Sequence, residues 1–212
     1  MMFLVRSFHW LCIRDSDMIQ VAAAGISGPK AEPDESQADK LKEKLWNNES
    51  FEDWAEVMNT NVTSVYFTTV AFLPLLQAAC KAKGHLHSSV IVISSMSGIM
   101  RDAQGHFSYN ASKGATVHLS KLMSAEFQKT GIRVNSIAPG YFPSEMTMGE
   151  SNEDNKSKLP DKDVQEKGHV PAQRGGHDDE MAQAVLFLAK NKYVSGEIIA
   201  VDGGVLNVVA GR

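Results

Sequence analysis

The chain has 212 residues, 43% of them apolar, and a formal net charge of −4. This length suffices for a single domain with a buried core, and the slight negative charge gives no electrostatic basis for binding nucleic acid or an anionic membrane. Two cysteines, Cys12 and Cys80, are too few for a disulfide framework, so we expect a soluble protein of the reducing cytoplasm.

The first segment, residues 1–17, is apolar in character but is interrupted by Arg6 and His9 and leads to no small-residue cleavage site. We therefore expect no signal peptide. Because no apolar run in the chain reaches the length of a bilayer span, we also expect no membrane segment.

Four short apolar runs predict buried parallel strands. They are rich in β-branched residues and end in Gly, Ser or Pro, and they cover residues 18–25, 88–95, 131–140 and 196–204. A strand buried on both faces has this nearly continuous apolar pattern, whereas a half-exposed strand alternates.

Longer amphipathic segments separate the strands and predict helices. Ser50, with Asp53 three residues later, resembles a capping box that starts a helix over residues 51–81. A second helix is predicted from Ser108 to Lys129, and a third begins near Asp178. Alternating strands and helices predict an α/β fold: a three-layer, doubly wound parallel sheet of the Rossmann type.

Two charged segments interrupt this alternation. Residues 27–50 and residues 143–176 carry little apolar periodicity, so we expect solvated loops over most of their length. The second segment follows the carboxyl end of a predicted strand, where ligands bind in open α/β sheets, which favours a mobile lid there. No linker or internal repeat indicates a second domain.

Three polar side chains are predicted to meet at one edge of the sheet. Ser95 follows a strand, and Tyr109 and Lys113 lie one helical turn apart on the helix that comes next. A phenol has a pKa near 10, and a nearby ammonium favours its phenolate, so the pair has the chemistry of a general acid and base. The spacing alone does not indicate catalysis, since a tyrosine and a lysine can lie four positions apart by chance.

Several motifs occur together and in order: "NTNVTSVYF", "VIVISSMSG", "YNASK", "RVNSIAPGYFPSEMT" and "GEIIAVDGG". Together they resemble the short-chain dehydrogenase/reductase family, particularly its 3-oxoacyl-carrier-protein-reductase-like members of fungal type, over about residues 18–206. The resemblance implies hydride transfer between NADP or NAD, with NADP preferred, and a small-molecule carbonyl or secondary alcohol. The wording of "GYFPSEMT" resembles enzymes of lipid or secondary metabolism.

The resemblance also implies roles for individual residues. Tyr109 matches the acid/base, Lys113 the residue that lowers its pKa and holds the nicotinamide ribose, and Ser95 the residue that binds the substrate carbonyl. Asn61 matches an asparagine that bends its helix and carries a water relay to the lysine. The remaining cofactor contacts implied are Gly25, Pro139, Gly140, Phe142 and Ser144.

Several of these polar residues also have purely structural interpretations. Ser94 is expected to cap a strand end only, and the residues 202–204, "DGG", to form a structural turn. The alternative for Asn61 is that it only forms a turn or bends its helix. His106 either lines the pocket or is a solvated loop histidine.

The sequence departs from the family at its start. No glycine-rich TGxxxGxG turn precedes residue 18, and Ala22 and Ala23 stand where the family has two asparagines. We therefore expect a divergent segment over residues 1–17 and an N-terminally truncated Rossmann-type domain over residues 18–212. Such a chain would expose the edge of the strand 18–25 and bind NAD(P) poorly.

Two function classes follow. The first is an NAD(P)-dependent oxidoreductase that forms a homo-oligomer through the apolar surface of helix 108–129. The alternative is a catalytically inactive remnant that acts only as a binding or assembly partner.

Overall fold

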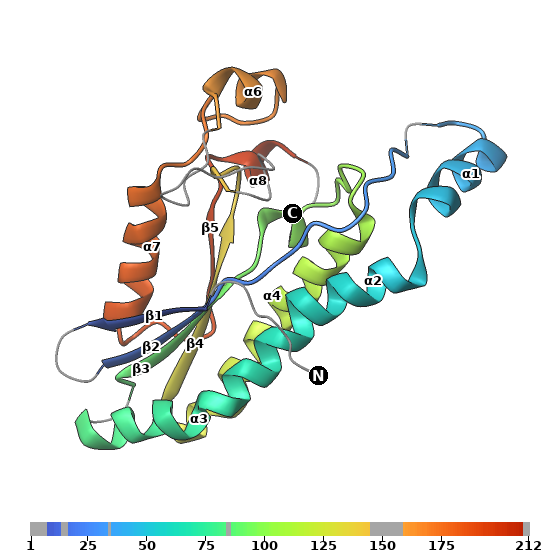
Figure 1. Ribbon diagram of the computed structural model, residues 1–212. Coiled ribbons are helices and arrows are strands. Elements are labelled where there is room, and N and C mark those ends of the chain that lie inside the picture. The colour runs from blue at the N-terminus through green and yellow to red at the C-terminus, as the bar shows by residue number, and fades with distance from the viewer. Residues whose placement is uncertain (1–7, 14–16, 34, 84–85, 145–158, 210–212) are drawn as a thin grey trace, which may run out of the picture.

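A five-stranded sheet lies at the centre of the molecule (Figure 1). The computed structural model describes residues 8–13, 17–33, 35–83, 86–144 and 159–209. The strands stand in chain order, β1-β2-β3-β4-β5. Their bounds are β1 Phe8–Ile13, β2 Asp17–Ala22, β3 Ser88–Ile93, β4 Ile132–Pro139 and β5 Ile198–Val201. Strands β2 to β5 are parallel, which confirms the four predicted strands and the α/β class.

Strand β1 was not predicted. It pairs antiparallel with β2, from Phe8 opposite Ala22 to Ile13 opposite Asp17. The expectation that the edge of β2 would be bare is therefore wrong, because β1 supplies the hydrogen-bonding partners of that edge. The sheet is mixed, with one antiparallel strand beside four parallel ones.

Helices cover both faces of the sheet, which gives the expected three layers (Figure 1). Helices α2 Phe51–Met58 and α3 Ser64–Lys83 join through a π-helical turn, η1 Asn59–Thr63, and lie on one face with α4 Phe107–Phe127. Helix α7 Asp178–Lys190 covers the other face. The short elements are η2 Met96–Gly98, η3 Gln128–Thr130 and α8 Val205–Val208.

Local signals fixed several helix ends as predicted. The Ser50 hydroxyl accepts a hydrogen bond from the Asp53 amide at 3.1 Å and caps the start of α2. After α4 and η3 the helical run ends at Gly131, which adopts the left-handed conformation (φ 78°) that glycine tolerates at a helix C-terminus.

The long helix from Phe51 to Ala82 corrects one expectation. By length and composition it is apolar enough to cross a membrane, although we predicted no such run. Its side chains Val65, Leu76 and Cys80 are buried in the same core cluster as Val90 and Val134 of the sheet. Packing one apolar stripe against a sheet is what the core helix of a globular domain does.

The two charged segments contain helices that we did not predict. Helix α1 Ala38–Asn48 lies within residues 27–50, and none of its residues is buried. The expected solvent exposure is confirmed, but the expectation of a loop is wrong for these residues. Helix α6 Asp161–Glu166 lies within residues 143–176 and buries Val164. Residues 145–158, where the predicted lid would begin, lie outside the described residues.

Candidate active site

The carboxyl ends of β2 to β5 meet at one edge of the sheet, and the predicted site residues follow these ends. Ser95 comes two residues after β3, and Tyr109 and Lys113 occupy the first turns of α4. The Ser95 side chain lies close enough to the Tyr109 phenol to lower its pKa. The Lys113 Nζ atom lies 5.7 Å from the centroid of the Tyr109 ring. The structure therefore brings all three side chains together.

Lys113 is a buried cation. The residue is 4% exposed, and its ammonium donates a hydrogen bond to the Ile93 carbonyl at 3.0 Å. Burial lowers its pKa from 10.5 to about 8. An ammonium has three N–H groups, and the described contacts give this one a single acceptor, so the site has room for further acceptors such as sugar hydroxyls.

The pKa of Tyr109 is raised above its ordinary value of 10, mainly by burial, while the hydrogen bond with Ser95 opposes the rise. We expected Lys113 to lower this pKa. In this structure the ammonium points to the Ile93 carbonyl, and the burial of the phenol outweighs any attraction to the cation. The phenol of this site is therefore protonated at neutral pH.

Asn61 is fully buried inside the π-helical turn η1. Its Oδ1 accepts from the Ile26 amide at 2.8 Å, and its Nδ2 donates to the Ile26 carbonyl at 2.9 Å and to the Ser112 hydroxyl at 2.9 Å. The side chain thus ties the segment after β2 to two helices. Gly25 precedes the anchored Ile26, which places it at the same sheet edge.

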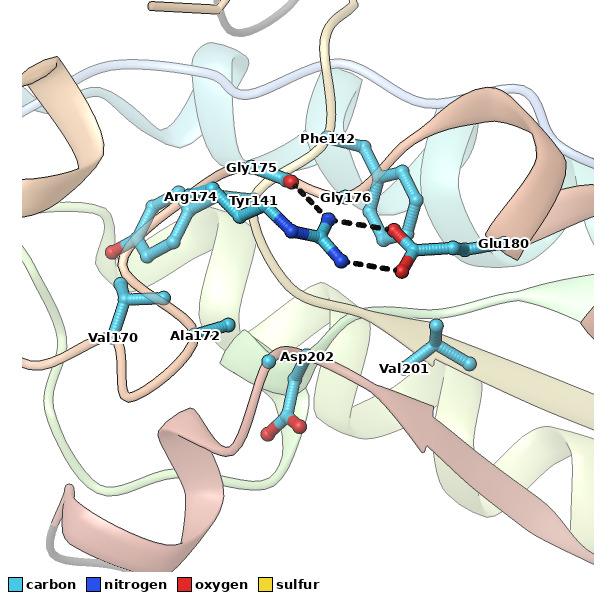
Figure 2. Close-up of a pocket in the computed structure, with 11 residues that line it drawn as sticks. Tyr141, Phe142, Val170, Ala172, Arg174, Gly175, Gly176, Glu180, Val201 and Asp202 are labelled. Carbon is cyan, nitrogen blue, oxygen red and sulfur yellow. Dashed lines mark hydrogen bonds and ion pairs between the residues drawn. The ribbon is translucent and has the colours of Figure 1, made fainter. Parts of the chain in front are cut away.

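The turn after β4 depends on close backbone contacts. Gly140 donates from its amide to the Val201 carbonyl at 2.9 Å, and a Cβ atom at this position would lie 2.6 Å from the Cα of Asp202. Pro139 ends the strand just before this contact, and Ser144 follows in irregular structure. Phe142 packs its ring against Gly176, as Figure 2 shows together with the Arg174–Glu180 ion pair nearby.

The contacts of Ser94 and of residues 202–204 agree with the purely structural roles expected for them. Ser94 donates to the Ile137 carbonyl at 3.0 Å and accepts from the Ser136 hydroxyl at 2.8 Å, so it joins two strand ends. The Asp202 carboxylate accepts from the amides of Gly204 and Leu206 at 3.0 and 2.8 Å, which makes residues 202–204 a structural turn.

His106 is not the solvated loop histidine of one of the two readings. It is partly buried beside Pro29 and Lys30, in the segment that follows β2. Burial, and next the charge of Lys30, lower its pKa below the ordinary value. It is therefore a packed loop residue.

Gly98 is a site residue that sequence reasoning missed. A Cβ atom on Gly98 would lie 2.4 Å from the backbone carbon of Lys113, so only glycine lets η2 approach α4 this closely. The contact sets the position of the lysine relative to Ser95. The signal available was the glycine in "SSMSG", but its partner lies in another element.

The described residues contain no group of three or more His, Cys, Asp or Glu side chains placed to hold a metal ion. The residues present do fit a nicotinamide cofactor, since a buried amine with spare donors and a tight glycine turn border the same edge.

This fold and this site define a class. The chain belongs to the short-chain dehydrogenase/reductase family. The family model described as "Enoyl-(Acyl carrier protein) reductase" matches residues 36–206, which confirms the resemblance drawn from the motifs.

Individual proteins similar to this chain support the family assignment. "Short-chain dehydrogenase/reductase SAT3" of Stachybotrys chartarum is 36% identical over 207 residues, covering 89% of this chain and 75% of that protein. "3-oxoacyl-[acyl-carrier-protein] reductase FabG" of Chlamydia muridarum is 36% identical over 166 residues, covering 77% and 60%. The solved "RhlG/NADP active-site complex" of Pseudomonas aeruginosa superposes with a TM-score of 0.70 at 31% identity, covering 88% of this chain and 65% of that one. The chain therefore spans 60–75% of the length of these proteins.

Proposed function

We propose that this protein is an NAD(P)-dependent oxidoreductase that transfers a hydride between nicotinamide and a carbonyl or secondary alcohol. The observation that supports it best is the convergence of Ser95, Tyr109 and Lys113 at the carboxyl edge of the sheet. Its relatives carry the names of oxidoreductases, and the RhlG structure is described as an NADP complex.

In this mechanism the bound cofactor supplies or accepts the hydride at the substrate carbon. Tyr109 Oη would exchange a proton with the substrate oxygen, and Ser95, which lies beside Tyr109, would hydrogen-bond that same oxygen and hold it in place. Lys113 would hold the nicotinamide ribose, whose hydroxyls can accept its remaining N–H groups. Gly25, Asn61, Pro139, Gly140, Phe142 and Ser144 complete the proposed cofactor contacts.

At neutral pH the Tyr109 phenol is protonated and can serve as the acid for carbonyl reduction. A protonated phenol is the acid that a carbonyl needs when it receives a hydride, whereas alcohol oxidation needs the phenolate. A protonated phenol is retained up to the raised pKa, so the reductive direction has its acid available over the whole neutral range.

The finer assignments are proposals as well. NADP is the preferred cofactor, and the substrate is a small-molecule carbonyl compound of lipid or secondary metabolism, as the names of FabG and of the rhamnolipid-biosynthesis reductase of Pseudomonas aeruginosa suggest. We propose a cytoplasmic homo-oligomer with one Rossmann-type domain over residues 18–212.

The deciding experiment compares two tyrosine variants. Tyr109→Phe removes one hydroxyl and is expected to lower turnover of a ketone substrate with NADPH by at least about 10²-fold, with the fold and cofactor binding retained. Tyr193→Phe is the matched control, because Tyr193 is 100% exposed and remote from the site. Near-normal activity of Tyr109→Phe contradicts the assignment.

The same assay tests the alternative. A folded wild-type chain that neither binds NADP nor turns over any of a panel of ketones and secondary alcohols would favour the inactive binding partner over the enzyme.

A further inference from the structure

Three separate chain segments meet at the hydroxyl of Tyr141. Gln104, in the loop before α4, donates from Nε2 to Tyr141 Oη at 2.8 Å. Tyr141 Oη lies 3.0 Å from Nε2 of His169, which belongs to the segment Leu159–Gly176. His169 Nδ1 lies 2.8 Å from the Lys167 carbonyl. None of these side chains was singled out by the sequence.

The chemistry of the groups fixes the direction of this chain. A carbonyl only accepts, so Nδ1 of His169 carries a proton, and in the neutral ring its Nε2 is then an acceptor. The Tyr141 O–H therefore donates to His169, and its oxygen accepts from Gln104. Burial raises the pKa of Tyr141, which keeps this O–H in place. Each of these polar groups is hydrogen-bonded to the next one, so the series of hydrogen bonds links three segments of the protein.

Apolar packing surrounds the polar chain. Tyr141 packs against a buried cluster that combines Met96 and Met100 with Val164 and Val170 of the segment Leu159–Gly176. The Lys167 ammonium lies 4.8 Å from the centroid of the Tyr141 ring, at a distance where a cation and an aromatic face attract.

The location connects this cluster with the reaction centre. Met96 directly follows Ser95, and Gln104 lies five positions before Tyr109. The segment Leu159–Gly176 is therefore fastened to the two stretches of chain that carry the proposed acid and its serine partner. Gln104 is also held at φ 50°, a left-handed conformation that is costly for a non-glycine residue and that marks an over-determined loop.

We infer that Gln104, Tyr141 and His169 form a positioning network that fixes the segment 159–176 against the Ser95 and Tyr109 stretches of the proposed site. The simpler alternative is that Tyr141 contributes apolar packing alone. The consequence for substrate binding rests on the proposed function, whereas the fastening of the segment does not.

Hydrogen exchange of the free protein separates the two readings without any need for activity. Tyr141→Phe keeps the ring and removes both hydrogen bonds of the hydroxyl, so amides of residues 159–176 and 101–106 are expected to exchange about 5- to 30-fold faster. Tyr193→Phe, at the fully exposed tyrosine, is the control and leaves these rates unchanged. Equal exchange in the two variants overturns the network.

A double-mutant cycle adds a second test. His169→Leu removes the same Tyr141–His169 bond from the other side, so the double variant is expected to show a smaller increase than the product of the two single effects. If the increase in the double variant equals the product of the two single effects, the residues act independently and the inference is overturned.

Kinetics then show what the network positions. With an active wild-type chain, Tyr141→Phe is expected to raise KM for the carbonyl substrate about 5- to 30-fold and to leave kcat and KM for NADPH within about twofold. A fall in kcat at unchanged KM overturns a role in substrate binding. If the wild-type chain shows no turnover, the proposed function fails, and the exchange rates alone decide the inference.

Discussion

Lys113 is a buried cation, so its ionisation changes the stability of the protein by a measurable amount. Its pKa is about 8 in the folded protein and 10.5 ordinarily, so between these values the unfolded chain binds more protons than the folded one. Stability therefore rises with pH across this window, because the cost of a buried ammonium is present below pH 8 and disappears as the group loses its proton.

Comparison with Lys113→Met isolates this effect from all other titrations. The unfolding free energy of the wild-type chain minus that of the variant is expected to rise by about 3 kcal/mol between pH 7.5 and 10.5, as urea titrations at each pH will measure. Parallel pH curves for the two proteins would contradict the burial of the charge.

Asn61 stabilises a long-range backbone contact from within the π-helical turn η1. Asn61→Ala leaves both the amide and the carbonyl of the half-buried Ile26 without their present partner, at a cost of about 1–2 kcal/mol for each group. We expect its unfolding free energy to fall by about 2–4 kcal/mol. Asn47→Ala, on the exposed surface of α1, is the control and is expected to change it by less than about 0.5 kcal/mol.

Tyr109 gives a pH dependence for the two reaction directions. Since its pKa is raised, the acid form is complete at low and neutral pH and is lost only as the pH rises through a value above 10. Carbonyl reduction is therefore expected to keep a constant kcat from pH 6 to 8, while alcohol oxidation increases with pH over the same range. Initial rates in both directions will test this, and a reduction rate that falls steadily from pH 6 to 8 would be inconsistent with it.

Among the elements, those with strong local patterns were predicted correctly. Strands β2 to β5 and helix α4 follow from apolar periodicity, and the start of α2 follows from Ser50. Strand β1 was missed because antiparallel pairing with β2 is a tertiary contact that its own sequence does not reveal. Helix α1 was missed because it buries nothing, so its charged residues carry no apolar stripe to detect.

The site divides in the same way. Ser95, Tyr109 and Lys113 were found because their residue types and spacing have a direct chemical meaning. Gly98 and the network at Tyr141 were not, because each depends on which distant segments touch it. The pKa of Tyr109 was predicted in the wrong direction for the same reason, since burial is a property of the folded chain.

The crossing of η2 over α4 provides a matched pair of glycine variants. Gly98→Ala would place Cβ 2.4 Å from the backbone carbon of Lys113, which cannot move aside, so we expect a loss of about 1–3 kcal/mol or more. Gly114→Ala, on the facing helix, would meet only the Gly98 carbonyl oxygen at 3.4 Å, an ordinary contact. Alanine favours the helix interior by about 1 kcal/mol over glycine, so Gly114→Ala is expected to be neutral or stabilising. Thermal unfolding of both variants will measure the difference, and equal melting temperatures would contradict the close crossing.

At the scale of the whole molecule, one side carries more apolar surface than a monomer needs. Phe51 is 86% exposed, Phe67 64% and Leu75 52% along the helices α2 and α3, and Leu122 of the neighbouring α4 is 52% exposed. Large exposed apolar patches mark interaction sites. Figure 1 shows α2, α3 and α4 together on this side of the sheet, with their outer faces uncovered by any other described element. Two occupants fit this surface by composition, a second copy of the chain or a bilayer.

We expect a second copy, because the inner stripe of the same helix is buried against the sheet and ties it to the domain. Phe67→Glu places a charge on the exposed apolar surface and is expected to shift a two-fold symmetric oligomer toward monomers. Tyr193→Glu introduces the same charge at a fully exposed position on the opposite side of the sheet, after α7, and is the control. Sedimentation velocity at micromolar concentration will show whether the wild-type chain and Tyr193→Glu form the same oligomer while Phe67→Glu does not. A stable wild-type monomer would rule out the self-association, and recovery of the wild-type chain only in detergent would instead favour insertion of the helix Phe51–Ala82 into a membrane.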